Sequence, residues 1–418
     1  MATTTTPHHL SNKHILITGA GLSGLSFTRA LQTLFPPNHP PPRLTILERD
    51  TQHDAEGRQG YTLSLAGTDT STSGLSALRD LGLLDSILAR SIIGLDSGSF
   101  KIWTADFKEW MSIRPRGADG IPTGAVRVAR RDLRRILLDA VGEDKIRWGS
   151  MCSSAEKLPN GKIRVTVQTG GTESVEECDL LVVADGANSK IRAGLRPEDG
   201  LDFAGAVQLV GVATFPEGGV PGPVDRNWGL QVSNARGVCC FYAPTDAQNV
   251  LWSLSFLEGR PRPKRTYATR EDMQPLLDEA RERGKVLGEQ FLRIVEATTD
   301  PAGVSCLSAR DKKPFVHDDP GAGIVYIGDS NHAVSPFAGY GANLALKDGW
   351  DLAKSLVETG SVAEAVRRYD GLSYSRAVKV LDSSRWRIRN AHSTGVRFWL
   401  FRALIVFGGY MFWVMGRS

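Results

Sequence analysis

The segment HILITGAGLSGL, from His14 to Leu25, decides the fold of this 418-residue chain. Its short apolar run stops at Gly19, and apolar residues then recur at helical spacing as far as Leu34, before the prolines of FPPNHPPP. A second apolar run, Leu44 to Leu47, follows and ends at Glu48. The order strand, glycine-rich turn, helix and strand predicts a βαβ unit, the building block of parallel sheets covered by helices.

The turn GAGLSG, from Gly19 to Gly24, has the spacing GxGxxG. In such a turn Gly19 permits the tight bend, Gly21 lets a phosphate approach the backbone, and Gly24 lets the helix pack on the strand. The N-terminus of the helix supplies amide donors and the positive end of its dipole. Glu48, 24 positions after Gly24, can accept hydrogen bonds from ribose hydroxyls. The unit therefore predicts a dinucleotide site, in which we include the adjacent Arg49.

A second glycine-rich segment, IGDSNHAVSPFAGYGANLALKDG, begins at Ile327, about 300 residues after the first. Its strand ends in a Gly-Asp pair whose carboxylate can accept from ribitol or ribose hydroxyls, and its glycine-rich turn precedes a helix whose positive end would face the flavin ring. FAD is too long for one βαβ crevice, so we expect the two loops to hold opposite parts of FAD. The candidate contacts in this segment are Gly328, Asp329, Pro336, Gly339, Gly341, Ala342 and Asn343.

A third segment, DLLVVADGANSKIR, predicts a buried strand, an Asp185-Gly186 turn and a helix start that carries Arg192. With these three signatures in this order, the sequence resembles the single-component FAD-dependent monooxygenases related to para-hydroxybenzoate hydroxylase. The resemblance is strongest to the branch that contains the tetracycline-inactivating and salicylate hydroxylase-like enzymes. It covers the chain from Lys13 to about Asn390.

The resemblance implies an α/β fold: a Rossmann-type FAD-binding domain with an inserted, mostly β substrate domain and a helical C-terminal region. It also implies that Arg130, in VARRDLRRIL, contacts FAD, with Arg131 as the alternative one residue later. Arg58 is implied to lie near the flavin or the substrate, and Asp185 joins the candidate cofactor contacts.

The resemblance further implies that NADPH or NADH reduces FAD, which reacts with dioxygen and transfers one oxygen atom to an apolar aromatic or polycyclic small molecule. Hydroxylation or epoxidation in specialised metabolism is the expected role. Two alternatives stay open: a reductase or dehydrogenase without oxygen transfer, and a non-redox cyclase or binding protein that keeps FAD as a structural element. We assign no catalytic residue, because His332 fits a structural role better than that of a base. Cysteine and histidine spacings predict no metal site.

The composition, with 41% apolar and 23% charged residues, is that of a globular protein. A net charge of +4 spread over the whole chain gives no reason to expect a nucleic-acid partner. The start of the chain lacks the apolar stretch of a signal peptide, and the five cysteines fit a reducing compartment, so we expect an intracellular protein. The expected division is a disordered lead at 1–12, an FAD-binding domain at 13–200 and 307–360, a substrate domain at 201–306, a C-terminal helix at 361–395 and an apolar tail at 396–418.

The tail contains 14 uncharged, mostly apolar residues from Ala403 to Gly416, fewer than the roughly 20 that span a bilayer. Three interpretations stay open: a marginal transmembrane anchor, an interfacial helix, and a helix buried against the protein body or a partner chain. Tryptophans and arginines near its ends favour membrane contact through Val396 to Ser418.

Overall fold

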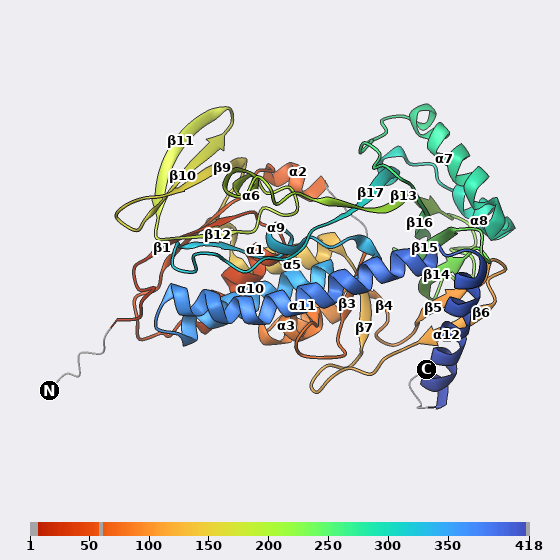
Figure 1. Cartoon of the computed structure of the whole chain (residues 1–418), viewed down its shortest axis with the longest axis horizontal. Coiled ribbons are helices and arrows are strands. Elements are labelled where there is room, and N and C mark those ends of the chain that lie inside the picture. The colour runs from red at the N-terminus through yellow and green to blue at the C-terminus, as the bar shows by residue number, and fades with distance from the viewer. Residues whose placement is uncertain (1–6, 58–61, 415–418) are drawn as a thin grey trace.

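A parallel five-stranded sheet lies at the centre of one half of the molecule (Figure 1). The computed structural model describes residues 7–57 and 62–414, with side chains described for 7–54 and 62–411. The sheet carries the predicted βαβ unit, and its two middle strands are buried over their whole length, as expected when helices cover both faces. In spatial order its strands are β18 (Ile324–Tyr326), β12 (Leu180–Val183), β1 (His14–Thr18), β2 (Arg43–Leu47) and β8 (Ile146–Arg147).

Helices α1 (Leu22–Leu34) and α10 (Gly341–Glu358) pack directly on each other. A Cβ atom on Gly349 would lie 2.5 Å from the backbone nitrogen of Phe27, so only glycine allows this approach. The Ser26 hydroxyl donates to the carbonyl of Leu346 over 2.7 Å. The helices that follow the two glycine-rich loops are therefore fixed against each other, although about 320 residues separate them in the chain.

The second half of the molecule is built on a seven-stranded sheet, which helices α7 (Arg270–Gly284) and α8 (Glu289–Glu296) cover on one face (Figure 1). Trp252, Leu254 and Phe256 alternate along one strand and pack beneath these helices. Its strands are β17 (Ser305–Asp311), β13 (Asp202–Thr214), β16 (Asn249–Leu257), β15 (Val238–Pro244), β14 (Trp228–Val232), β5 (Phe100–Trp103) and β6 (Glu109–Ile113). Strands β5 and β6 lie outside the expected 201–306 segment. They belong to this sheet because β5 pairs in parallel with β14, far along the chain.

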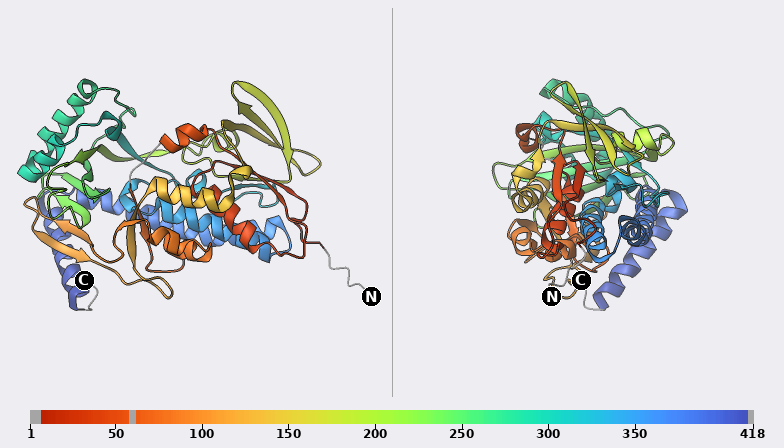
Figure 2. Two further views of the ribbon diagram at one scale, coloured as in Figure 1. Left: turned by 180° about the vertical axis from the view of Figure 1, so that it is seen from behind. Right: turned by 90° about the vertical axis from the view of Figure 1, so that its left-hand side faces the viewer.

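Two three-stranded antiparallel sheets complete the strands. One joins the two halves and consists of β3 (Thr62–Ala66), β7 (Ala125–Ala129) and β4 (Ser91–Ile93). The other projects from the first half and consists of β9 (Ser150–Lys157), β10 (Ile163–Thr169) and β11 (Thr172–Cys178) (Figure 2). The remaining short helices are α2 (Gln52–Gly57), α3 (Gly74–Asp80), α4 (Leu84–Leu88), α6 (Lys190–Leu195), α9 (Asp329–His332), η1 (Glu143–Lys145), η2 (Lys285–Leu287), η3 (Pro301–Gly303) and η4 (Pro336–Ala338).

Helix α11 (Val362–Ala391) extends along the molecule from the parallel sheet to the seven-stranded sheet (Figure 1). It contacts α10 and η4 at the level of the second glycine-rich segment, and β13 further along. Together with α5 (Arg130–Val141), which packs on α1, these elements give the expected α/β fold with a second, antiparallel sheet and a helical C-terminal region.

Helix α12 (Gly395–Val414) argues against a transmembrane anchor as the interpretation of the tail. Within the described residues no helix is long and apolar enough to cross a membrane. Phe398, Phe401 and Ile405 are at most 9% exposed and pack against the edge of the seven-stranded sheet. One face of the helix is thus buried against the protein body, one of the three interpretations left open. Its opposite face exposes Trp399, Leu400 and Phe407, and interfacial membrane contact stays a prediction.

The expected disordered lead is wrong for the part that the structure describes, residues 7–12. Leu10 is 1% exposed and belongs to the main hydrophobic core. The His8 ring lies 3.2 Å from the carbonyl of Val357, near the end of α10. The polar composition of this segment did not predict the contacts that Leu10 and His8 make with the protein body.

Candidate functional site

The glycines of the first loop have two different functions in the fold. Gly19 adopts φ +95°, and a Cβ there would lie 2.7 Å from the carbonyl oxygen of Ala184. A Cβ on Gly24 would lie 2.2 Å from the carbonyl oxygen of Gly19. At Gly21 the nearest atom would be 4.0 Å away, so the protein itself leaves room there. Gly21 is the N-cap of α1 and has no side-chain cap, which leaves backbone donors at this helix end for a ligand.

Glu48 lies beside this loop at the end of β2 and is 7% exposed. Its carboxylate accepts from the backbone nitrogen of Ala20 over 2.9 Å and from that of Asp50 over 3.0 Å. Arg134 of α5 lies 3.5 Å from the same carboxylate and donates through Nε to the carbonyl of Ala20 over 3.0 Å. No sequence pattern singles out Arg134, whose only signal is its position one helical turn after Arg130.

The other candidate arginines differ in position. Arg49 is exposed and lies 3.6 Å from Asp50, so it faces solvent beside the loop. Arg130 is the exposed first residue of α5, and it lies close enough to Asp329 for its charge to act against the burial that raises the pKa of that carboxyl. Arg58 lies outside the described residues.

Asp185 follows β12 directly beneath the first loop, where its Cα would lie 3.3 Å from a Cβ on Gly19. Burial raises the pKa of its carboxyl, although hydrogen bonds from Ser189 and from the backbone of Lys190 act against this. Its Oδ2 accepts from the backbone nitrogen of Lys190 over 3.0 Å, whereas Oδ1 is buried without a protein partner in the described part of the chain. A ligand hydroxyl could therefore donate to this free oxygen.

Arg192 ties this turn to the second glycine-rich segment. Its guanidinium donates to the carbonyl of Ser330 over 2.8 Å and to that of Ala187 over 2.5 Å. The contact with Ser330 holds the segment around Asp329 next to the end of β12. Gly328 packs closely against α1, since a Cβ at this position would lie 2.9 Å from the Ser23 hydroxyl. The three predicted segments therefore meet at one edge of the parallel sheet.

Asp329 is half-buried at this junction, and none of its contacts within the described residues is a hydrogen bond to the carboxylate. Burial raises the pKa of its carboxyl, and the nearby His332 and Arg130 act in the opposite direction. A carboxylate that has lost part of its water shell without gaining protein donors is suited to accept from ligand hydroxyls.

The turn that follows leads into α10. Pro336 and Gly339 are exposed, and Gly341 and Ala342 are half-buried at the start of the helix. Asn343, by contrast, is buried and accepts from the backbone nitrogens of Ala66 and Gly74 over 2.8 and 2.9 Å. It therefore fastens β3 and α3 to the start of α10 rather than facing a ligand. The exposed part of the turn is free to contact a flat ring.

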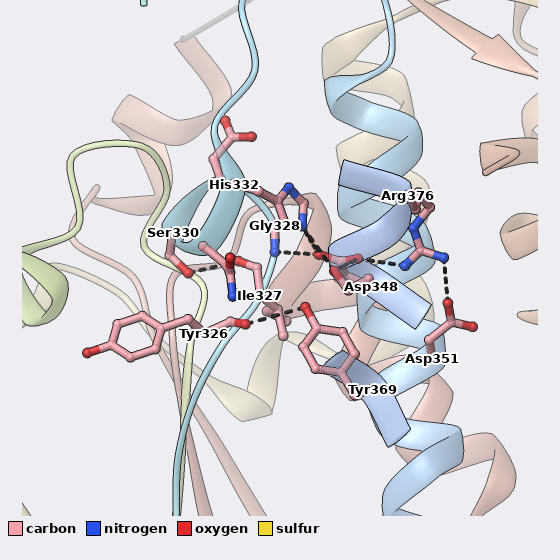
Figure 3. Close-up of polar contacts among 12 residues, drawn as sticks. Tyr326, Ile327, Gly328, Ser330, His332, Asp348, Asp351, Tyr369 and Arg376 are labelled. Atoms are coloured by element: carbon pink, nitrogen blue, oxygen red, sulfur yellow. Dashed lines mark hydrogen bonds and ion pairs between the residues drawn. The ribbon is translucent and has the colours of Figure 1, made fainter. Parts of the chain in front are cut away.

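A buried ionic network supports this segment from below (Figure 3). Asp348, which is 0% exposed, accepts from the backbone nitrogen of Gly328 over 2.8 Å and lies 2.5 Å from His332 Nε2. Arg376 of α11 donates to Asp348 and to Asp351, each over 2.8 Å. Burial acts to raise the pKa of Asp348, but the adjacent His332 and Arg376 outweigh it and hold the pKa well below its usual range. His332 thus has a structural partner, in line with the role expected for it.

These observations fit FAD. The room above Gly21 and the uncapped start of α1 suit a pyrophosphate, and Glu48 lies where ribose hydroxyls would follow. The free carboxylate oxygens of Asp185 and Asp329 suit the hydroxyl-rich middle of the molecule. The turn before α10 would then face the ring. Of the predicted residues, Arg49 and Asn343 do not point into this arrangement.

Replacing Asp329 by asparagine should weaken FAD binding while sparing the apoprotein. We expect about a tenfold higher Kd, because one charge-assisted hydrogen bond is worth about 1.5 kcal/mol. Since the pKa of Asp329 is raised in the fold, its ionised form costs stability at neutral pH, and this cost disappears as the pH falls through that pKa. The variant apoprotein should therefore have a Tm equal to or above wild type at pH 7, with no difference in acid.

FAD titration by fluorescence quenching and melting of the apoprotein from pH 4 to 8 test this prediction. Asp106→Asn, at an exposed position in the other half, is the control. An unchanged FAD affinity in Asp329→Asn would contradict the assignment.

The comparisons with known proteins agree with this geometry. A family model described as FAD binding domain matches residues 12–370. Monooxygenase cfoF of Aspergillus candidus is 39% identical over 396 residues, which cover 93% of this chain and 94% of that protein. Salicylate hydroxylase of Pseudomonas putida is 26% identical over 330 residues, 71% of this chain and 73% of that protein. The crystal structure of Klebsiella pneumoniae HpxO with FAD and uric acid is similar with a TM-score of 0.72, 19% identity and coverage of 96% of this chain and 97% of that one.

Proposed function

The chain belongs to the FAD-binding family of flavoprotein monooxygenases, and from this we propose that it uses NAD(P)H and dioxygen to hydroxylate or epoxidise an apolar aromatic or polycyclic small molecule. The observation that carries the proposal is the meeting of three glycine-containing segments at one edge of the parallel sheet, beside the sheet that joins the two halves. The similarity to a fungal monooxygenase over nearly the whole chain supports a role in specialised metabolism.

Different residues would bind different parts of FAD. Gly21 and the start of α1 would bind the pyrophosphate, Glu48 would bind the adenosine ribose, and Asp185 and Asp329 would bind the ribityl hydroxyls, with Arg130 close to Asp329. Asp348 and Arg192 hold the Gly328–Asp329 turn in position. Bound FAD supplies the electron transfer from NAD(P)H and the activation of dioxygen.

The substrate lies on the face of the seven-stranded sheet opposite α7 and α8. Because side chains alternate along a strand, the burial of Trp252, Leu254 and Phe256 under these helices places Ser253 on the other face. Phe241 neighbours Ser253 across the strands on that face. Segments 13–200 with 307–360 and 201–306, together with β5 and β6, are then the cofactor and substrate parts of one site.

The proposed reaction consumes one NAD(P)H, one proton and one dioxygen for each substrate. One oxygen atom enters the substrate and the other leaves as water, while NAD(P)H is oxidised to NAD(P)⁺. The protein contributes orientation, exclusion of water and electrostatic support.

Labelled dioxygen tests the proposal directly. The purified protein should show the visible spectrum of oxidised FAD, oxidise NADPH slowly under air, and do so faster with a substrate from an aromatic and polycyclic panel. Product formed under ¹⁸O₂ should carry one ¹⁸O atom. Turnover without label would indicate a reductase or dehydrogenase, and a protein that cannot be reconstituted with FAD would favour the non-redox alternative.

A further inference from the structure

Arg127 is a buried arginine between the two halves of the molecule, and no carboxylate of the described residues pairs with it. It lies on β7, the middle strand of the sheet formed with β3 and β4, and is 4% exposed. Its guanidinium carbon lies 5.4 Å from the ring centre of Phe241, on β15 of the seven-stranded sheet. A cation is therefore held where the proposed cofactor and substrate regions face each other.

All of its hydrogen-bond acceptors in the described residues are neutral. Nη1 donates to the Ser64 hydroxyl over 2.8 Å, and Nη2 donates to the carbonyl of Thr62 over 2.9 Å and also to its hydroxyl. Nε is buried and has no partner in this part of the chain. Burial lowers the pKa of Arg127 to about 9, and no carboxylate offsets this effect.

Each of the other buried arginines and lysines in the described chain lies near a carboxylate. Arg376 lies 2.8 Å from Asp348, Lys312 lies 3.0 Å from Asp199, Lys347 lies 3.2 Å from Asp351, and Arg192 lies 4.0 Å from Asp199. Each of these four has a carboxylate partner, whereas Arg127 has none among the described residues. Since an uncompensated buried charge is costly, a fold that keeps one needs an anionic partner from elsewhere.

Two contacts connect Arg127 with the site already described. The Ser64 carbonyl accepts from the side chain of Asn343 over 3.0 Å, in the first turn of α10. On the other side, Phe241 neighbours Ser253, whose hydroxyl accepts from Gln208 over 3.0 Å. The Oε1 atom of Gln208 is buried and also lacks a partner in the described residues. An unused donor and an unused acceptor thus lie on the two surfaces that face each other.

We propose that Arg127 binds an anionic oxygen of a ligand held between the β3-β7-β4 sheet and the seven-stranded sheet. The oxygen belongs either to the substrate, as a carboxylate, phenolate or enolate, or to the ring of reduced FAD. Both would supply the acceptor that Nε lacks. This inference rests on the proposed function, because it needs FAD and substrate to bind at this place.

Arg127→Met in the FAD-loaded enzyme separates the two sources. The probes are salicylate with salicylamide and 2-naphthoate with 2-naphthamide, measured by their perturbation of the flavin spectrum. If the substrate supplies the oxygen, wild type should prefer the carboxylates by about 10- to 100-fold, the range for a charge-assisted hydrogen bond, and the variant should lose this preference. If FAD supplies it, the midpoint potential of bound FAD should fall in the variant.

A structural role is tested with the apoprotein. Methionine removes an unpaired buried charge at Arg127, so the Tm should not fall, whereas Arg376→Met removes a paired one and should lower it. The proposal would be overturned if Arg127→Met left both the preference for carboxylates and the midpoint potential of bound FAD unchanged. It would also be overturned if neither protein preferred carboxylates and the potential did not change. A loss of Tm in Arg127→Met equal to that in Arg376→Met would overturn it as well. A wild-type protein that fails to bind FAD would instead refute the proposed function.

Discussion

Replacing Gly21 by alanine should give a protein that folds as well as wild type and does not retain FAD. The backbone at Gly21 has φ −82° and ψ −178°, which any residue adopts, and the nearest atom that a Cβ there would meet outside its own helix, among the described residues, is the Ala184 carbonyl oxygen at 4.0 Å. The cofactor, in contrast, has to bring its pyrophosphate against this backbone to reach the amides of α1. A methyl group in that space should raise the Kd for FAD by about 100-fold or more, equivalent to about 2.7 kcal/mol.

Two further glycine variants make this result interpretable. Gly24→Ala should destabilise the apoprotein itself, because its Cβ would lie 2.2 Å from the carbonyl oxygen of Gly19. Gly371→Ala, at an exposed position in α11 with no atom within 4 Å, should bind FAD normally and gain about 0.5–1 kcal/mol of stability. Melting of each apoprotein and FAD titration give both quantities. Normal FAD binding by Gly21→Ala would mean that the pyrophosphate lies elsewhere.

The glycine-rich loops could be predicted from sequence because their signals are local. Gly19 to Gly24 lie between a strand and a helix, and the positions of Glu48 and Asp329 follow from the ends of two strands. The expected α/β fold was therefore accessible, with one exception: β5 and β6 join the seven-stranded sheet through a parallel pairing with β14 that no local pattern indicates.

The polar network beneath the site could not be predicted, since it depends on which distant side chains meet. Asp348 and Arg376 are 28 residues apart on two helices, and their contact follows from the way α10 and α11 pack. The same is true of Arg127, whose partners Ser64 and Phe241 come from different sheets. No sequence pattern distinguishes these charged residues from charged residues on the surface. Only the fold shows that they are buried.

Asp348→Leu should be the most destabilising single substitution in the cofactor region. Asp348 is 0% exposed and is the common partner of the Gly328 amide, His332, Ser373 and Arg376. Leucine fills the space but accepts no hydrogen bond, so Arg376 loses one of its two carboxylate partners and keeps Asp351 and the carbonyl of Ser71, and the Gly328 amide loses its acceptor. Leaving one partner of a buried ion pair behind costs about 3–5 kcal/mol. The Gly328–Asp329 turn also loses its support, so FAD affinity should fall together with stability.

The pH dependence distinguishes the loss of this carboxylate from a general packing defect. Because the pKa of Asp348 is held below its ordinary value of 3.8, its stabilisation is complete above that value and is lost as the pH falls towards the lowered pKa. Urea unfolding of the apoproteins at pH 7 and at pH 3 should therefore show a smaller gap between wild type and Asp348→Leu in acid. Leu352→Ala, at a buried apolar position one turn later in α10, is the matched control, since its cavity cost of about 2–5 kcal/mol should be the same at both pH values. A gap for Asp348→Leu that is equally constant would show that the carboxylate contributes no charge-dependent stability.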